Sequence, residues 1–263
     1  MTHSATTSKE FKTEKDMHLK TVQASAVRSV FEVLKDIIND VNVYFKEDGV
    51  TIITLDTARA TLVHMHLGAE NFEEYKCVQP ITAGINMNNT YKLLKSMSNN
   101  DTLTINIVNT DYMEFVIENV TKRSSTRFNL KLLDINEDVL DAPDIQMDVI
   151  TTMPSIDFQR IVRDMGNIAT DMSIMRKGQT LELSCIGDFA NQTTVIEYPD
   201  EVQGEVGNTF SLKYINLFTK ATGMCSSVQI MQQSESNDMP IIFRYTIANL
   251  GDIKFYLAPK VEN

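Results

Sequence analysis

Two stretches of this chain, 128 positions apart, carry the same helical pattern. In 25–38 and in 155–168, apolar residues recur three and four positions apart, which places them on one side of a helix. The shift puts Val30 on Phe158, Val33 on Ile161 and Leu34 on Val162. A second pair of helical stretches, 89–97 and 212–221, follows in the same order, each ahead of an alternating strand. We interpret this order as an internal duplication of one unit with strands and two helices.

Outside these helices, apolar and polar residues alternate over many short segments. Each alternation predicts a strand with one buried face, and turn signals at 47–49, 176–178 and 249–252 separate the segments. The chain is therefore predicted to be a sheet-rich α+β protein. The buried positions of five strands are expected to be Val63, Met65 and Leu67; Leu103, Ile105 and Ile107; Phe128, Leu130 and Leu132; Leu181, Leu183 and Cys185; and Ile241, Phe243, Tyr245 and Ile247.

An acidic stretch separates the two copies. Residues 134–149 contain five Asp, one Glu and one Pro, a composition typical of an exposed connector. We therefore predict a first domain at 17–133, the connector at 134–149 and a second domain at 150–263. The polar, aperiodic residues 1–16 are predicted to form a disordered N-terminal extension.

The composition is that of a globular protein. At 263 residues and 43% hydrophobic content, the chain can bury a core without a metal or a disulfide. Three scattered cysteines without CxxC spacing favour reduced thiols in an intracellular protein. The polar N-terminus lacks a secretory signal, and no run approaches the ~18 apolar residues of a membrane span. We expect no cofactor and no membrane partner.

The formal net charge of −11 argues, taken alone, against nucleic-acid binding. However, each predicted helix carries two basic residues three or seven positions apart, which lie on one side of the helix. One such helix is usually just a solvated face, but four indicate a continuous basic surface on an acidic body. Such a surface suits a phosphate backbone without reading bases. The pairs are Arg28 and Lys35, Lys92 and Lys95, Arg160 and Arg163, and Lys213 and Lys220.

Four segments carry a family resemblance, in one register from about Met17 to the C-terminus. They are 49–67 with Phe72 five residues on; 76–95, which includes Gly84-Ile85-Asn86-Met87 and Tyr91-Lys92-Leu93-Leu94-Lys95; 218–222; and 255–262, which reads Phe-Tyr-Leu-Ala-Pro-Lys-Val-Glu. They resemble the signatures of the proliferating cell nuclear antigen family, here in a divergent form of the kind expected from a large DNA virus or a protist.

The resemblance implies a sliding DNA clamp without enzymatic activity. Three chains join head to tail into a homotrimeric ring, with twelve helices around the hole and a continuous sheet outside. The ring encircles double-stranded DNA, is opened by a clamp loader and tethers DNA polymerase and other replication and repair proteins. It implies a nuclear location, or a viral replication compartment for a viral source.

The resemblance also implies three sets of site residues. The DNA-facing set is Lys20, Arg28, Lys35, Lys92, Lys95, Arg160, Arg163, Lys213 and Lys220. The pocket for a partner peptide of the form Gln-x-x-aliphatic-x-x-aromatic-aromatic is Leu55, Arg59, Leu62, Leu140, Pro240, Tyr256, Ala258 and Pro259. The subunit joint pairs the strand around 127–131 with a neighbour's 180–185 and involves Phe128, Leu130, Val162, Met165, Leu181 and Leu183.

Some positions depart from the family pattern. Arg59 stands where cellular members commonly have His, and Ala142 replaces a larger aliphatic residue, so the peptide preference is expected to differ. The turn that carries a ubiquitin-accepting lysine is shortened to Arg176-Lys177-Gly178, which leaves the role of Lys177 open.

Two other hypotheses compete with a replication clamp. An enzyme is disfavoured because the chain lacks nucleotide-binding, nucleophile-elbow and HExxH motifs. His64 and His66 share a strand face and could start a metal site, but the sequence offers no evident third ligand. The second hypothesis is a specialised clamp, either one subunit of a checkpoint ring or a clamp for viral late transcription.

Overall fold

The computed structural model describes residues 16–56, 58–107, 109, 111–143, 145–234 and 238–260. The predicted N-terminal extension, apart from residue 16, and Val261 and Glu262 of the last family segment lie outside these residues. In the first half the elements are β1 (Met17–Thr21), α1 (Ala24–Leu34), β2 (Asp40–Lys46), β3 (Gly49–Leu55), β4 (Thr61–Gly68), η1 (Ala69–Asn71), β5 (Glu74–Cys77), β6 (Ile81–Asn86), α2 (Met87–Leu94), β7 (Asp101–Ile107), β8 (Tyr112–Asn119) and β9 (Ser124–Lys131).

The second half repeats part of this order. Its elements are β10 (Val149–Pro154), α3 (Ser155–Gly166), β11 (Asp171–Ile186), β12 (Asn191–Ser211), α4 (Leu212–Phe218), η2 (Thr219–Gly223), β13 (Ser227–Gln232), β14 (Ile241–Ile247) and β15 (Gly251–Leu257). The pairing of β1 with β7 recurs as β10 with β13, and that of β7 with β8 recurs as β13 with β14. This repeated pairing agrees with the predicted duplication.

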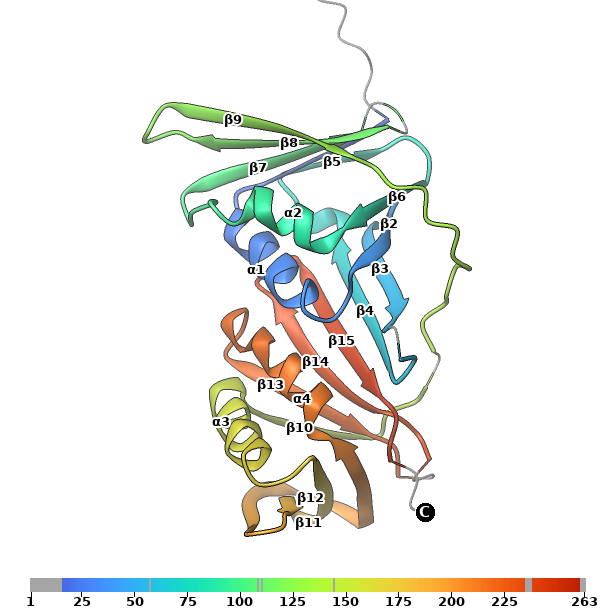
Figure 1. The fold of residues 1–263 in the computed structure, drawn as a ribbon, viewed down its shortest axis with the longest axis vertical. Coiled ribbons are helices and arrows are strands. Elements are labelled where there is room, and N and C mark those ends of the chain that lie inside the picture. The colour runs from blue at the N-terminus through green and yellow to red at the C-terminus, as the bar shows by residue number, and fades with distance from the viewer. Residues whose placement is uncertain are drawn as a thin grey trace, which may run out of the picture.

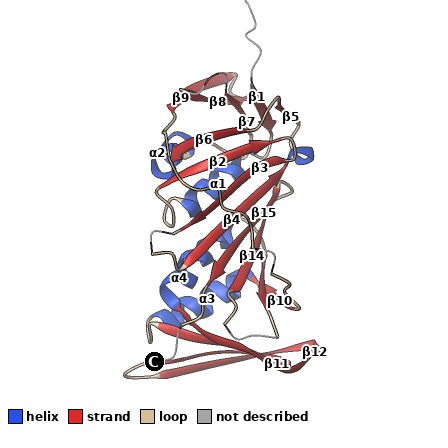
Figure 2. Ribbon diagram, turned by 90° about the vertical axis from the view of Figure 1, so that its right-hand side faces the viewer, coloured by secondary structure: helices blue, strands red, loops and turns tan. Residues whose placement is uncertain are grey.

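In the part of the chain that the structure describes, the four α-helices lie on one side and the sheets on the other (Figures 1 and 2). One sheet has five strands in the order β5-β1-β7-β8-β9, and β11 and β12 form a two-stranded sheet. The largest sheet, β10-β13-β14-β15-β4-β3-β2-β6, takes strands from both halves. Its central pair joins Gly251–Leu257 to Thr61–Leu67, so the halves share one continuous sheet.

The predicted buried faces are confirmed. Val30, Val33 and Leu34 on α1 are buried, as are their counterparts Phe158, Ile161 and Val162 on α3. Both helices therefore press an apolar stripe onto the sheet, as their spacing requires. The apolar side chains of all five predicted strands face inward. Phe128, Leu130 and Leu132 are only half-buried, because they lie on or next to the edge strand of their sheet.

Helix ends differ from the prediction by a few residues. α2 begins at Met87, two residues early, because the Asn86 side chain accepts a hydrogen bond from the Asn89 amide and caps the helix. α1 ends at Leu34, which leaves Lys35 as its C-cap. The fourth helix ends at Phe218, and Lys220 lies in the 3₁₀ turn η2, where the Thr219 hydroxyl donates to the Asn216 carbonyl.

The predicted turn at Arg176-Lys177-Gly178 is wrong. These residues continue β11, and the pairing register with β12 shifts around Gly178 (φ +51°). Arg176 is fully buried there; its guanidinium donates to the carbonyls of Gly178 and Asp200 and lies 5.1 Å from the Tyr198 ring. These bonds stabilise the irregular segment, which explains why a turn-like sequence remains in a strand.

The connector follows β9 on the side of the molecule away from the helices (Figure 1). Leu133 forms an isolated bridge with Gly84, and no helix or strand is assigned to the described residues from there to Asp148. Cys77, Cys185 and Cys225 are free thiols. No helix in the described residues is long and apolar enough to cross a membrane.

Candidate nucleic-acid interface and docking sites

The helix layer gathers the predicted DNA-facing residues on one side of the molecule. The helix layer is taken as the four helices, the two residues after α1, the residue after α2, and η2. These residues, 24–36, 87–95, 155–166 and 212–223, include eight basic and four acidic side chains. The whole chain, by contrast, carries a net charge of −11. The helix layer is therefore basic on an acidic protein, as the sequence predicts. Lys20 lies apart on β1, where its ammonium group pairs with Glu74 of β5 at 3.2 Å.

Several of these cations have acidic partners. Arg160 pairs with Asp157 at 3.2 Å and Arg163 with Asp164 at 3.5 Å, and both guanidinium side chains stay about two-thirds exposed. On α2 and α4, by contrast, the helical sequences contain no acidic residue. Lys92 donates to the Asn89 amide oxygen at 3.4 Å, and the Lys213 ammonium lies 5.5 Å from the Tyr214 ring. Arg28 donates to the Met97 carbonyl.

One acid lies between two of the lysines. The Asp36 carboxylate accepts from Lys35 at 2.8 Å and from Lys220 at 2.6 Å. Burial alone would raise the pKa of Asp36, but the two lysines outweigh it and hold that pKa below its usual value. The pair with Lys220 joins residues 184 positions apart and links the two halves on the helix side.

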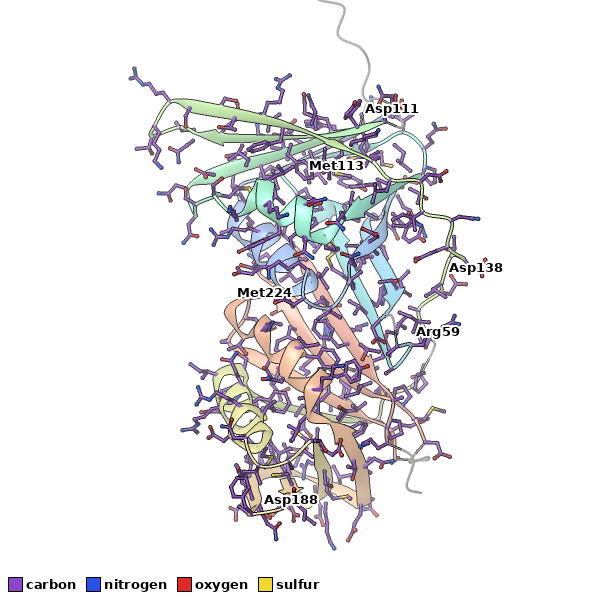
Figure 3. The ribbon with its side chains drawn as sticks, in the orientation of Figure 1. Arg59, Asp111, Met113, Asp138, Asp188 and Met224 are labelled. Atoms are coloured by element: carbon purple, nitrogen blue, oxygen red, sulfur yellow. The ribbon has the colours of Figure 1, made fainter. Side chains whose placement is uncertain are left out.

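A hollow of about 580 Å³ lies beneath the connector, on the opposite side of the molecule. The segment after α1, the end of β3, the β3–β4 loop and connector residues 136–138 and 140 line it. Arg59 and Asp138, one from each wall, are labelled in Figure 3. The hollow combines apolar positions, Leu55 and Leu140, with charged ones, which is typical of a site that binds a peptide with defined polar anchors.

Asp56 shapes the loop that carries Arg59. Its carboxylate accepts hydrogen bonds from the amides of Ala58, Ala60 and Thr61 at 2.8–3.2 Å. This tight loop holds Arg59 in the left-handed region (φ +56°), which is uncommon for a non-glycine residue. Asp56 also accepts a hydrogen bond from the Tyr214 hydroxyl of α4. Burial raises the pKa of the Tyr214 phenol, and the nearby Asp56 carboxylate raises it further.

The structure brings together part of the predicted peptide pocket. Leu55, Arg59 and Leu140 line the hollow. Leu62 lies opposite Leu55 on one side and opposite Tyr256 on the other, so these three residues cross adjacent strands. The amide of Ala258, next to Pro259, donates to the Ala60 carbonyl at 3.4 Å, which places the C-terminal segment against the Arg59 loop.

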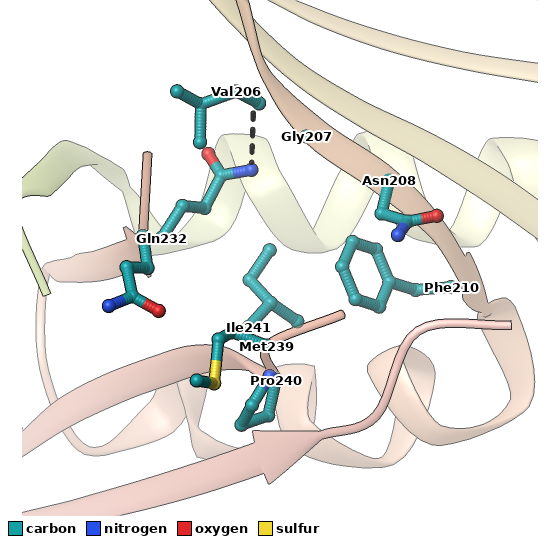
Figure 4. Close-up of a pocket in the computed structure, with 9 residues that line it drawn as sticks. Val206, Gly207, Asn208, Phe210, Gln232, Met239, Pro240 and Ile241 are labelled. Carbon is teal, nitrogen blue, oxygen red and sulfur yellow. Dashed lines mark hydrogen bonds between the residues drawn. The ribbon is translucent and has the colours of Figure 1, made fainter. Parts of the chain in front are cut away.

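Pro240 precedes Ile241, which pairs with Leu257 of β15, so it lies beside the Ala258–Pro259 end of the predicted pocket. It lines a separate small cavity of about 20 Å³ with Phe210 and Gln232, among others (Figure 4). There the Gln232 amide donates to the Val206 and Ile174 carbonyls at 3.4 and 3.3 Å. A space of this size holds about one water molecule, so it cannot itself take a peptide side chain.

The predicted subunit joint lies between chains and stays a prediction: one edge of β11 pairs with β12, and no strand in the described residues pairs with its other edge. Val162, Met165, Leu181 and Leu183 are fully buried in the chain's own core, because they belong to the inward stripe of α3 and the inward face of β11. Exposed apolar side chains at this end of the molecule include Ile186 (83%) and Phe189 (77%), which flank Asp188 in the sequence (Figure 3), together with Ile156 (68%) on α3 and Val195 (55%) on β12.

At the other end of the molecule, β9 is the outermost strand of the five-stranded sheet. Phe128 and Leu130 on this strand are half-buried and pack partly against the core. A hollow of about 460 Å³ beside Ile186, lined by residues 166–170 and 186–188, lies at the opposite end.

The two histidines do not form part of a metal site in the described residues, where no group of three or more potential ligands occurs. The His66 ring hydrogen-bonds Thr51 at 3.1 Å. Burial, followed by nearby Lys254, lowers the pKa of His64.

Sequence reasoning missed the contacts between the halves. Asp36 stands next to Lys35, a predicted DNA-facing residue, but nothing in the sequence points to its second partner, Lys220. Likewise, Asp56 and Tyr214 lie on different halves, and only the fold brings them together.

Comparison with known proteins agrees with this geometry. Residues 17–140 match the family model described as proliferating cell nuclear antigen, N-terminal domain, and residues 141–260 match the corresponding C-terminal domain. The two matches meet inside the stretch 134–149 predicted as the connector; the domain limits themselves stay a prediction. The chain is also 38% identical over 254 residues to the "Probable DNA polymerase sliding clamp 1" of Paramecium bursaria Chlorella virus 1. That alignment covers 92% of this chain and 96% of the viral protein. With both domains matched in order over the basic helix layer and the shared sheet, the chain belongs to the proliferating cell nuclear antigen family of sliding clamps.

Proposed function

We propose that three copies of this chain close head to tail into a ring that holds duplex DNA against its helices. The observation that carries the proposal is the charge contrast between the basic helix layer and the acidic chain as a whole. A hole lined by such helices attracts the phosphate backbone, while the acidic outer surface repels it. DNA can then slide through, because contacts to phosphates carry no sequence information.

The two ends of the molecule support a head-to-tail ring. β9 leaves one strand edge free beside half-buried Phe128, and the two-stranded sheet of β11 and β12 lies at the opposite end with exposed Ile186 and Phe189 (Figure 1). Exposed apolar residues and open strand edges are costly unless a partner covers them. Different surfaces at opposite ends make a heterologous contact, which closes into a ring when the rotation allows.

The hollow beneath the connector is the proposed docking site for polymerase and other partners. A peptide with spaced aliphatic and aromatic residues would fill the apolar positions Leu55 and Leu140 and reach Leu62 and Tyr256 on the neighbouring strands. Arg59 and the acidic connector would then contact the polar parts of the peptide. Pro240, immediately before β14 and beside Ala258, would extend the pocket on that side.

The protein would act without chemistry of its own, as a processivity factor. Its viral relative is named for a DNA polymerase, so we assign a replication role ahead of a checkpoint or late-transcription role. We place its action where DNA is replicated, in a nucleus or a viral replication compartment.

The test combines assembly and activity. Light scattering of the purified chain should give the mass of a trimer, and the protein should lengthen the products of a cognate polymerase on a primed template when a clamp loader is present. A chain that stays monomeric at micromolar concentration, or rings that leave product length unchanged, would contradict the proposal.

A further inference from the structure

The seam between the two halves contains a carboxylate at the centre of the basic layer. Asp36 follows the C-cap of α1, and Lys220 lies in η2 of the other half. Next to them is a hollow of about 260 Å³ between α1 and η2, lined among others by Val33 and Met224. Figure 3 shows Met224 at this seam, on the helix side and far from Arg59.

Asp36 binds two of the nine predicted DNA-facing cations at once. The Lys220–Asp36 bond is 2.6 Å and the Lys35–Asp36 bond 2.8 Å, whereas Asp157 and Asp164 on α3 each bind one arginine. Lys35 is held further by the Tyr91 ring, 5.3 Å away, and Tyr91 hydrogen-bonds Glu32. The side chains of Lys35, Asp36 and Lys220 are 21%, 31% and 46% exposed, so phosphates can still reach the cluster.

We propose that Asp36 limits how tightly the ring grips DNA, by serving as the shared counter-ion of Lys35 and Lys220. A lysine that is paired with a carboxylate has part of its charge neutralised already, so binding a phosphate releases fewer counterions. A clamp must hold DNA and still slide along it. A carboxylate beside the two lysines lowers their affinity for phosphates while both lysines stay in place. Because Lys220 comes from the other half, the same acid also ties the halves together on the helix side. This inference rests on the proposed DNA path.

The experiment compares Asp36→Asn with Asp164→Asn, a matched helix-layer control that frees one arginine. Each trimer is titrated with a short fluorescent duplex over a range of salt concentrations. Freeing two lysines should steepen the log–log salt slope by up to ~1.8 per contacting subunit, against ~0.9 for the control. Over a fourfold rise in salt, these slopes correspond to an additional loss of affinity of roughly twelvefold and threefold. At low salt, Asp36→Asn should bind more tightly than either the control or the wild type.

A second variant separates charge from structure. Lys220→Gln also breaks the bond between the halves, but it removes a cation, so it should weaken binding and flatten the slope. If Asp36→Asn and Lys220→Gln change DNA binding in the same direction, the seam acts structurally and the inference fails. Equal slopes for Asp36→Asn and Asp164→Asn also overturn it. A wild-type ring without salt-dependent DNA binding would instead contradict the proposed function itself.

Discussion

Gly84 on β6 and Leu133 at the start of the connector are bonded backbone to backbone, with the Leu133 amide 2.8 Å from the Gly84 carbonyl. A Cβ on Gly84 would lie 2.2 Å from the Leu133 carbonyl oxygen, so a side chain cannot fit here without moving the connector. The Asn42 side chain donates a hydrogen bond to the Ile135 carbonyl at 3.1 Å and so holds the connector two residues further along. The base of the connector is thus fixed to the sheet just before it reaches the docking hollow.

Gly84→Ala should therefore displace the connector and weaken peptide binding. We expect a loss of about 1–3 kcal/mol in the free energy of unfolding, since the clash is with backbone and not with a flexible side chain. Gly166→Ala is the control, because a Cβ added there, at the end of α3, would meet no atom within 4 Å. It should be neutral or stabilise by up to about 1 kcal/mol. Urea unfolding and calorimetric peptide titration measure both effects; equal behaviour of the two variants would contradict the close-contact argument.

Phe128→Ala should shift the protein from trimer toward monomer. Burying a large aromatic side chain contributes ~2–3 kcal/mol, and aromatic anchors dominate interfaces. Each ring has three joints, so one substitution weakens all of them. Light scattering over a dilution series is the measurement, with circular dichroism to check the fold. Val78→Ala, at an exposed apolar position after β5, is the control. A Phe128→Ala protein that stays fully trimeric at low micromolar concentration would exclude β9 from the joint.

Leu140→Ser should weaken binding of a Gln-x-x-aliphatic-x-x-aromatic-aromatic peptide. Leu140 lines the hollow, and its loss removes an apolar wall worth about 1–3 kcal/mol, or roughly fivefold to 150-fold in Kd. Val139→Ser is the matched control, because Val139 is exposed and does not line that hollow. Titration calorimetry compares the two variants with the wild type. Equal affinities for all three would place the docking site elsewhere.

Reversing the charge at Lys35, Lys92, Arg160 and Lys220 should collapse processive synthesis while leaving trimers intact. Each change acts three times around the ring, whereas a single Lys→Ala change should do much less because phosphate contacts are individually modest. The matched control reverses four lysines outside the helices: Lys46, Lys76, Lys122 and Lys254. Product length on a long primed template is compared at two salt concentrations. Products as long as wild type from the helix variant at both would show that the helices do not line the DNA path.

Asp101 should make the fold sensitive to acid. Its carboxylate is buried and accepts hydrogen bonds from the Ser98 amide and the Asn119 side chain. Burial would raise the pKa of Asp101, but these bonds hold it below the usual value. The stabilisation is therefore present above the unfolded pKa near ~4 and is lost as pH falls through the lower, folded pKa. Asp101→Asn should cost about 1–3 kcal/mol at pH 7, and the difference from wild type should shrink toward zero in strongly acidic urea unfolding experiments. A difference that stays constant with pH would assign the effect to shape and not to charge.

The repeated unit, the buried faces and the basic helices could all be predicted from the sequence. These features follow from periodicity: Val30, Val33 and Leu34 had to share a helix face, and Ile241, Phe243 and Tyr245 a strand face, whatever the rest of the chain did. The family segments added the register from about Met17 onward, and both domain matches agree with it.

Which of these residues contact one another depends on how the chain folds in space. Val162 and Leu183 are buried in their own chain, whereas Ile186 and Phe189, on either side of Asp188 between β11 and β12, are among the exposed apolar residues at that end. Asp36 is hydrogen-bonded to Lys220, 184 positions away in the sequence, because β4 pairs with β15 and brings the two halves side by side. Local patterns report which way a side chain faces, but contacts between distant residues depend on how the sheets pair, and that information is spread over the whole chain.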